Sequence, residues 1–172
     1  MRKARSIPII AFIATFSSFV AASPPALENF RLTLGGLGPI RIGMTLKEVE
    51  DAGVRIKIDN NFDPNECAPA EVIGQRTLRL MFEEGRVSRI EIYGDHIATL
   101  SGARVGYTEE KVSQIYGRRL TVQPHKYDDL GHYMILLSTN KKYALVMETD
   151  GKVVTEFRAG FALPAQYVEG CL

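Results

Sequence analysis

Apolar and polar residues alternate along several segments of the chain, and this alternation predicts strands with one buried face. A Gly-containing turn at residues 83–86 and an Asp150-Gly151 pair each join two such segments, which predicts two β-hairpins. The predicted strands are residues 30–34, 54–58, 77–82, 87–93, 133–138, 143–148 and 153–157.

Two other stretches, residues 41–53 and 104–117, have the pattern of a turn followed by a short helix. In the first, Thr45 stands at the N-cap and Glu48 three positions later, which predicts a capping box. In the second, Thr108 is the N-cap, without a carboxylate at the third helical position. Glycines stand before each cap and after each helix, where turns and helix ends favour them: Gly43, Gly53, Gly106 and Gly117.

The two helix starts are separated by 106 − 43 = 63 residues, and predicted strands follow each of them. A sheet of two or three strands cannot bury its apolar face alone. The sequence therefore predicts an α+β fold of two tandem repeats, each a short capped helix followed by antiparallel strands, packed as one unit. Repeat 1 covers residues 39–99, and repeat 2 with a C-terminal tail covers 100–172. Residues 23–38 form a leader with a candidate edge strand.

The first 22 residues have the pattern of a secretory signal peptide. A basic head precedes an apolar run and the small-residue ending Val20-Ala21-Ala22, which predicts cleavage near Ala22 and a periplasmic or secreted protein. A retained membrane anchor is the alternative, but Pro8 and several hydroxyl residues interrupt the run. Cleavage leaves 172 − 22 = 150 residues with 21 − 3 = 18 Lys and Arg against 20 Asp and Glu. This balance favours neither nucleic acid nor an anionic membrane as the partner.

The chain contains two cysteines, Cys67 and Cys171. An even number of cysteines in a chain bound for an oxidising compartment favours a disulfide. This bond would close a loop of 171 − 67 = 104 positions and attach the C-terminus to repeat 1. Two free thiols or an intermolecular bond are the alternatives.

One loop of repeat 2 concentrates polar and aromatic residues. The first interpretation is a structural or solvated surface loop, and the second is a loop that binds a partner. Two imidazoles and two carboxylates are also ligands that zinc and related ions accept, but their spacing matches no zinc-enzyme motif. A metal or catalytic site is therefore the third interpretation. The candidate residues are His125, Lys126, Tyr127, Asp128, Asp129, His132 and Tyr133.

The elements Ile-Arg-Ile-Gly-Met-Thr-Leu-Lys-Glu-Val (40–49) and Ala-Arg-Val-Gly-Tyr-Thr-Glu-Glu-Lys-Val (103–112) resemble two families. These are the tandem-repeat β-lactamase inhibitory proteins and the outer-membrane assembly lipoproteins of the SmpA/OmlA type. The chain as a whole looks most like uncharacterised secreted bacterial proteins. It departs from the inhibitor family, which carries a disulfide within each repeat, and it contains no Trp.

The resemblance implies a surface that binds proteins. We therefore expect a secreted or periplasmic, non-enzymatic protein-binding module, inhibitor-like or envelope-associated, whose partner is another envelope or extracellular protein. We expect no cofactor, no metal, no nucleic acid and no membrane span in the processed chain, and we do not expect inhibition of β-lactamase itself. The alternatives are a metal-dependent hydrolase that uses the His125–His132 loop and a structural envelope factor.

Overall fold

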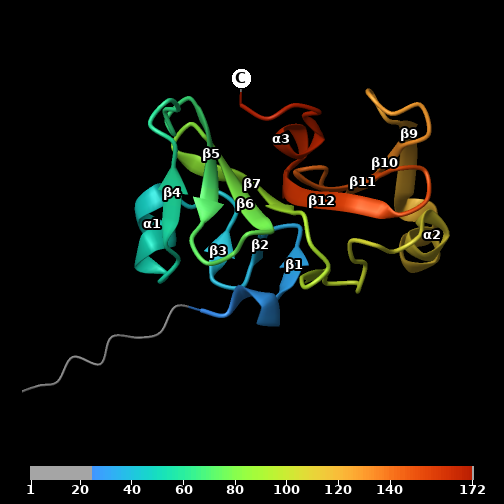
Figure 1. Ribbon diagram of the computed structural model, residues 1–172, viewed down its shortest axis with the longest axis horizontal. Helices are drawn as coiled ribbons and strands as arrows, with labels where there is room; N and C mark the ends of the chain where they lie inside the picture. Colours follow the sequence, from blue (N-terminus) through green and yellow to red (C-terminus); the bar gives the residue numbers. More distant parts are fainter. Residues whose placement is uncertain (1–24, 172) are drawn as a thin grey trace, which may run out of the picture.

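An eight-stranded antiparallel sheet forms the centre of the molecule. The computed structural model describes residues 25–171, and the strand order of this large sheet is β4-β5-β6-β7-β12-β11-β10-β9. The end strands β4 and β9 rise on either side of helix α3 (Ala162–Gln166), so the sheet is curved like a cup (Figure 1). We call the concave face that carries α3 the cup face and the opposite face the core face. The strands are β4 (Ile56–Ile58), β5 (Cys67–Val72), β6 (Leu78–Glu83), β7 (Arg86–Ile92), β9 (Leu120–Pro124), β10 (His132–Leu137), β11 (Tyr143–Thr149) and β12 (Val154–Phe161).

A second, smaller sheet covers the core face. Its order is β3-β2-β1-β8, with β1 and β8 parallel and the other pairs antiparallel. Leu32, Leu37 and Ile40 of this sheet share one buried apolar cluster with Leu80 and Ile90 of the large sheet. The main core therefore lies between the two sheets. The short elements of this layer are η1 (Leu27–Asn29), β1 (Arg31–Thr33), β2 (Gly36–Leu37), β3 (Ile40–Arg41) and β8 (Ala98–Thr99).

Two short helices begin where the sequence predicts capped helices. Helix α1 (Leu46–Asp51) has Thr45 as its N-cap, and both hydrogen bonds of the predicted capping box with Glu48 are present. Helix α2 (Glu109–Tyr116) has Thr108 as its N-cap and continues into the 3-10 turn η2 (Gly117–Arg119). The N–H of Gly43 donates to the carbonyl oxygen of Val87, and the N–H of Gly106 donates to that of Val154, both over 2.8 Å. Strands of the large sheet therefore hold the turns that precede both helices.

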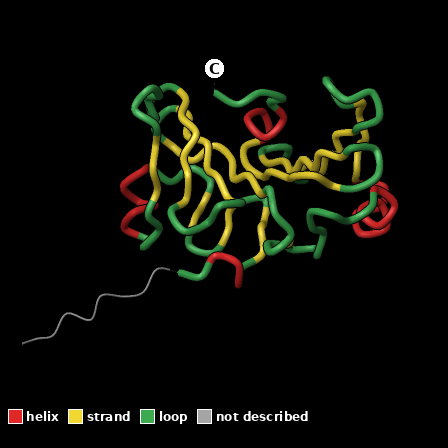
Figure 2. The backbone as a smooth tube through the Cα atoms, in the orientation of Figure 1, coloured by secondary structure: helices red, strands yellow, loops and turns green. Residues whose placement is uncertain are grey.

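The predicted α+β fold of two helix-first repeats is wrong, because strands in two sheets predominate in the described chain and the helices are short. The three α-helices have only six, eight and five residues, and Figure 2 shows two of them at opposite sides of the molecule and α3 over the concave face. Strands from both predicted repeats join through β7 and β12 into one sheet. The N-terminal region supplies a second sheet that covers its apolar face, with β1 in an inner position between β2 and β8. Sheet-on-sheet packing therefore takes the place that the prediction gave to helices.

The predicted disulfide between Cys67 and Cys171 is confirmed. Their Cα atoms lie 5.4 Å apart, and the bond attaches the segment after α3 to the start of β5. A disulfide is compatible with an oxidising, extracytoplasmic compartment. The predicted signal peptide lies outside the described residues. Among residues 25–171, no helix has the length and apolar character needed to cross a membrane.

Candidate functional site

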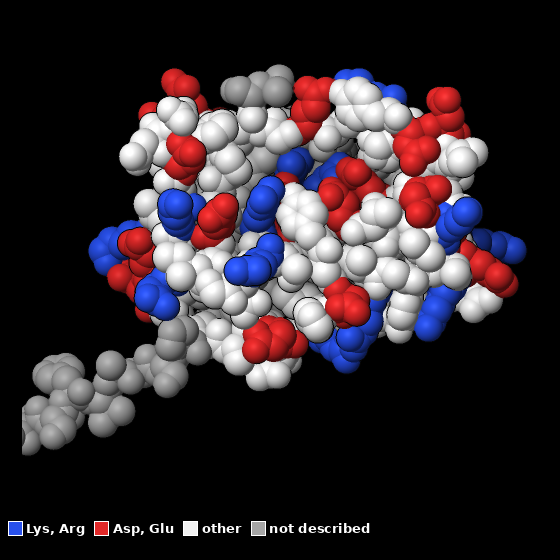
Figure 3. Space-filling model, in the orientation of Figure 1, with Lys and Arg blue, Asp and Glu red and all other residues white. Residues whose placement is uncertain are grey.

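The cup face carries charged side chains in the middle of the large sheet. The face of the molecule seen in Figure 3 is hollowed near its centre, and acidic and basic groups lie together in the hollow. Strand alternation explains their position, because Ile90 and Ile92 enter the core while Arg89 and Glu91, which alternate with them, point to the cup face. We call these five residues the cup cluster: Arg89, Glu91, Glu148, Glu156 and Arg158.

The strand register brings the members of the cup cluster together. Glu91 on β7 lies directly opposite Arg158 on β12, an arrangement that favours opposite charges. Glu148 on β11 lies directly opposite Glu156 on β12. Two like charges in such a pair destabilise a sheet, so this pair is the unusual part of the cluster.

The two arginines hold the C-terminal segment in the cup. Arg89 Nη1 donates to the carbonyl oxygen of Pro164 over 2.9 Å. Arg158 Nε donates to the carbonyl of Ala165 over 2.7 Å, and its Nη2 donates to that of Tyr167 over 3.0 Å. The guanidinium groups thus bind carbonyls at and just after the end of α3, and the carbonyl of Pro164 accepts both from Arg89 and from the N–H of Tyr167. The disulfide at Cys171 fastens the far end of the same segment.

Two of the three glutamates are well paired. Glu91 Oε1 accepts from Arg89 Nε over 2.6 Å, and Glu91 Oε2 accepts from the hydroxyl of Tyr93 over 2.6 Å. Burial, followed by the charge of Glu91, raises the pKa of Tyr93, so this hydroxyl keeps its proton as a donor. Glu148 accepts from Arg158 Nη1 and lies 3.2 Å from His125 Nε2.

Glu156 is the least paired carboxylate of the cup cluster. Its ion pair with Arg158 Nη1 measures 3.4 Å, and its side chain is 29% exposed, compared with 15% for Glu148. Burial is the main cause that raises the pKa of Glu156 from 4.5 to about 7, and the neighbouring charge of Glu148 adds to it. The hollow therefore holds a carboxyl group that changes its charge near neutral pH.

The two ring nitrogens of His125 face different groups. Its Nδ1 accepts from the backbone N–H groups of Tyr127 and Asp128, both over 3.1 Å. Its Nε2 faces Glu148. The cup cluster itself contains three carboxylates and two guanidinium groups, so its net charge is −1 when all three glutamates are ionised.

The structure divides the predicted partner-binding residues between two places. His125 stacks on the buried Tyr133 with ring centroids 4.5 Å apart, and both lie on the side of the cup cluster. His132 turns toward helix α2, where its Nδ1 lies 2.8 Å from Glu109 Oε1. The loop therefore does not present its two histidines on one surface.

The tip of the loop is exposed and faces the C-terminal segment. Lys126 Nζ lies 3.4 Å from Glu169 Oε1, which also accepts from the hydroxyl of Tyr127. Asp128 Oδ1 accepts from the N–H of Leu130 over 2.9 Å, and Asp129 is exposed beside it. Four of the seven predicted residues, from Lys126 to Asp129, thus form a rim next to the cup cluster.

The alternative of a metal site gains no support from the described residues. His125 and His132 face different carboxylates, Glu148 and Glu109. Within residues 25–171 there is no group of three or more His, Cys, Asp or Glu side chains arranged to hold a metal ion.

Comparisons with known proteins do not place the chain in a family. No family model and no curated protein matches the sequence, so the resemblance to the inhibitory proteins and the SmpA/OmlA-type lipoproteins gains no support there. Among solved structures, a similar one is the uncharacterized protein yfeY from Escherichia coli, with a TM-score of 0.49 and 13% identity. The match covers 76% of this chain and 99% of that protein. At this level the likeness carries no argument about function.

Proposed function

We propose that this protein is a secreted or periplasmic, non-enzymatic binding module, and that its cup face binds a partner protein that inserts a lysine or arginine side chain beside Glu156. The observation that carries the proposal is the state of Glu156 itself, a partly exposed carboxylate with one long ion pair in a hollow of net negative charge. A cationic group of a partner would supply the pairing that the fold leaves incomplete.

The unfavourable position of Glu156 supports a functional role. The chain places this carboxylate opposite Glu148 and partly buries it, and both effects disfavour its charged form. Groups that lower stability and have perturbed pKa values are concentrated at functional sites. A glutamine of nearly the same shape would avoid the repulsion, so the presence of a carboxylate here favours a role in binding.

The rim supplies contacts that a protein partner would use around this charge. The side chain of Tyr127 is 64% exposed, and Leu130, three residues further on, is 70% exposed. Exposed aromatic side chains often anchor protein interfaces, with charged groups setting specificity. The loop predicted from the sequence thus retains a part in the proposed surface, through its tip from Lys126 to Asp129.

A comparison of three immobilised proteins tests this function. The wild type, Glu156→Gln and the control Glu71→Gln are incubated with a secreted or periplasmic extract, and the bound proteins are quantified by mass spectrometry. Glu71 is a suitable control because it is an exposed carboxylate on β5 that pairs in register with Lys57 and Arg79.

The proposal expects the wild type and the control to recover one and the same protein. The recovered amount of that protein should fall at least about tenfold with Glu156→Gln, since the loss of one partner of a buried charge pair weakens binding by about that much or more. Recovery near pH 8 should also exceed recovery near pH 6, where Glu156 is mostly protonated. Identical sets of bound proteins for all three baits would contradict the proposal.

A further inference from the structure

The end of the molecule formed by η2 and the β10–β11 turn carries a group of exposed basic side chains. We call the following residues the basic end: Arg118, Arg119, Lys141 and Lys142. All four are exposed, and none forms an ion pair within residues 25–171. The segments 111–127 and 130–147, which contain them, include no Asp or Glu.

Strand pairing brings these four residues to the same end of the sheet. Leu120, next to Arg119, pairs with Leu136 at the end of β10. The turn that contains Lys141 and Lys142 begins directly after β10, and the N–H of Lys141 donates to the carbonyl of Ser138. Arg119 also lines a shallow groove of about 480 Å³ together with Leu136, Leu137 and Thr139.

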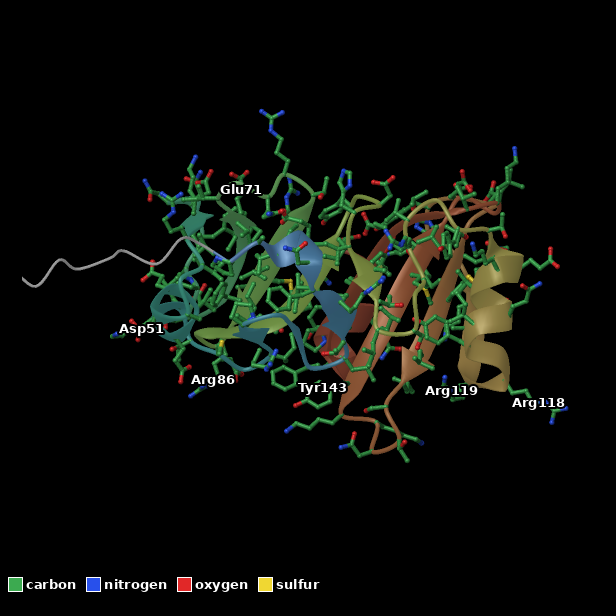
Figure 4. The ribbon with its side chains drawn as sticks, turned by 90° about the horizontal axis from the view of Figure 1, so that it is seen from below. Asp51, Glu71, Arg86, Arg118, Arg119 and Tyr143 are labelled. Atoms are coloured by element: carbon green, nitrogen blue, oxygen red, sulfur yellow. A yellow bond between two sulfur atoms is a disulfide. The ribbon has the colours of Figure 1, made fainter. Side chains whose placement is uncertain are left out.

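The two arginines of the basic end can be followed in Figure 4. Figure 4 shows Arg118 and Arg119 at the same edge of the molecule as Tyr143, pointing away from the sheet. Leu137 adds an apolar group to this edge, with 42% of its surface exposed. Acidic residues at this end of the strands, Glu66, Glu83 and Glu84, line a separate groove with Phe161 and Leu163.

We infer that the basic end docks the protein on the surface of a membrane rich in anionic phospholipids, with its four cations on the headgroup phosphates and Leu137 at the interface. The cations occupy two projecting segments, so a broad anionic plane can reach all four together. Such a surface also accepts an exposed leucine, which increases affinity through apolar burial. The near-neutral charge of the whole chain does not reveal this patch, because acidic residues elsewhere balance it.

Vesicle sedimentation tests the inference with the disulfide-bonded protein. The probes are vesicles of phosphatidylglycerol and of phosphatidylcholine at low ionic strength. The variants are Lys141→Gln with Lys142→Gln, Arg118→Gln with Arg119→Gln, and a control, Lys57→Gln with Lys152→Gln. The control removes the same charge from exposed positions outside the basic end. Circular dichroism checks that each variant is folded.

Each cation near an anionic surface should strengthen binding by about fivefold, so each pair at the basic end should weaken binding to phosphatidylglycerol by about 25-fold. The control pair should change it by less than about threefold, and added salt should weaken binding. Glu156→Gln should leave vesicle binding unchanged, which separates this inference from the proposed function.

Several outcomes would overturn the inference. Equal binding to both vesicle types would show that charge does not drive docking, and equal losses for all three double variants would show that the basic end is not the site. Competition by millimolar inorganic phosphate would indicate a site for the free anion. Tighter binding to poly-L-glutamate than to vesicles would favour an acidic protein segment over a membrane.

Discussion

Replacing Glu156 with glutamine should make the protein more stable at high pH and leave its stability unchanged at low pH. The pKa of Glu156 is raised from 4.5 to about 7 in the folded protein. The folded state therefore binds a proton where the unfolded state has lost it, and the free energy of unfolding falls as the pH rises between these two values. Glutamine carries no titrating group and should remove this fall.

The structure sets the size of the effect. A carboxyl whose pKa rises over this range lowers the free energy of unfolding by roughly 3 kcal/mol once the pH exceeds both values. The side chain of Glu156 is 29% exposed, and solvent screening reduces the effect to about 2 kcal/mol. Glu156→Gln should therefore raise the free energy of unfolding by about 2 kcal/mol near pH 8 and by less than about 0.5 kcal/mol near pH 4.

Urea unfolding followed by circular dichroism at a series of pH values measures this difference. Other titrating groups contribute to both proteins and cancel in the comparison. Glu71→Gln, on an exposed position of the same face, should change stability by less than about 0.5 kcal/mol throughout. The reasoning would be refuted if the free energy of unfolding had the same pH dependence in the wild type and in Glu156→Gln. It would also be refuted if Glu156→Gln were less stable than the wild type near pH 8.

Four further variants test the fold by urea unfolding. Cys67→Ala with Cys171→Ala should lower the free energy of unfolding by about 2–5 kcal/mol. An equal decrease on reduction of the wild type would show that the loss of the disulfide causes it. Thr45→Ala removes the N-cap acceptor of α1 and should lower the free energy of unfolding by about 1 kcal/mol. An unchanged free energy of unfolding would show that the cap is dispensable. Gly160→Ala places a Cβ 2.2 Å from the carbonyl oxygen of Ser88 and should lower the free energy of unfolding by roughly 3 kcal/mol. At Gly35 a Cβ would meet nothing within 4 Å, so Gly35→Ala should be nearly neutral, and equal effects at both glycines would contradict the close packing of β7 on β12.

Features set by neighbouring residues could be predicted from the sequence. The capping box of Thr45 and Glu48 needs only residues within one helical turn, and it is present. The predicted hairpin at residues 77–93 corresponds to β6 and β7, whose turn contains Gly85. The pairing of Cys67 with Cys171 followed from their number alone.

Features set by distant contacts could not be predicted in the same way. Strand β5 contains Pro69 and two buried alanines, and its conformation depends on its place between β4 and β6. Strand β9 is mostly exposed and is held by β10 alone. The fold class was wrong for the same reason, because the junction of β7 with β12 and the covering by the small sheet are long-range pairings that leave no local pattern.

The cup cluster escaped sequence analysis because alternation assigns polar strand positions to solvent. In residues 87–93, Arg89 and Glu91 stand where such a strand exposes its polar face. They become buried only because α3 returns over β7 and β12 and brings its carbonyl groups to Arg89 and Arg158. A short segment with small apolar residues directly after the last strand, including Ala162 and Ala165, was the available signal that this face is covered.

Some side chains of the cup cluster hold the fold together, whereas Glu156 makes few contacts within the protein and can bind a partner. Arg89 and Arg158 are occupied by Glu91, Glu148 and the carbonyls of the C-terminal segment, so their removal should release that segment and damage the fold. Glu156 contributes no comparable bond, and its charge lowers stability. Loss of binding in Glu156→Gln can therefore be separated from loss of structure, since this variant should be more stable than the wild type near pH 8. A variant that is more stable and no longer binds would show that the carboxylate is kept for recognition. A variant that is more stable and binds normally would leave the cup cluster with a structural role alone.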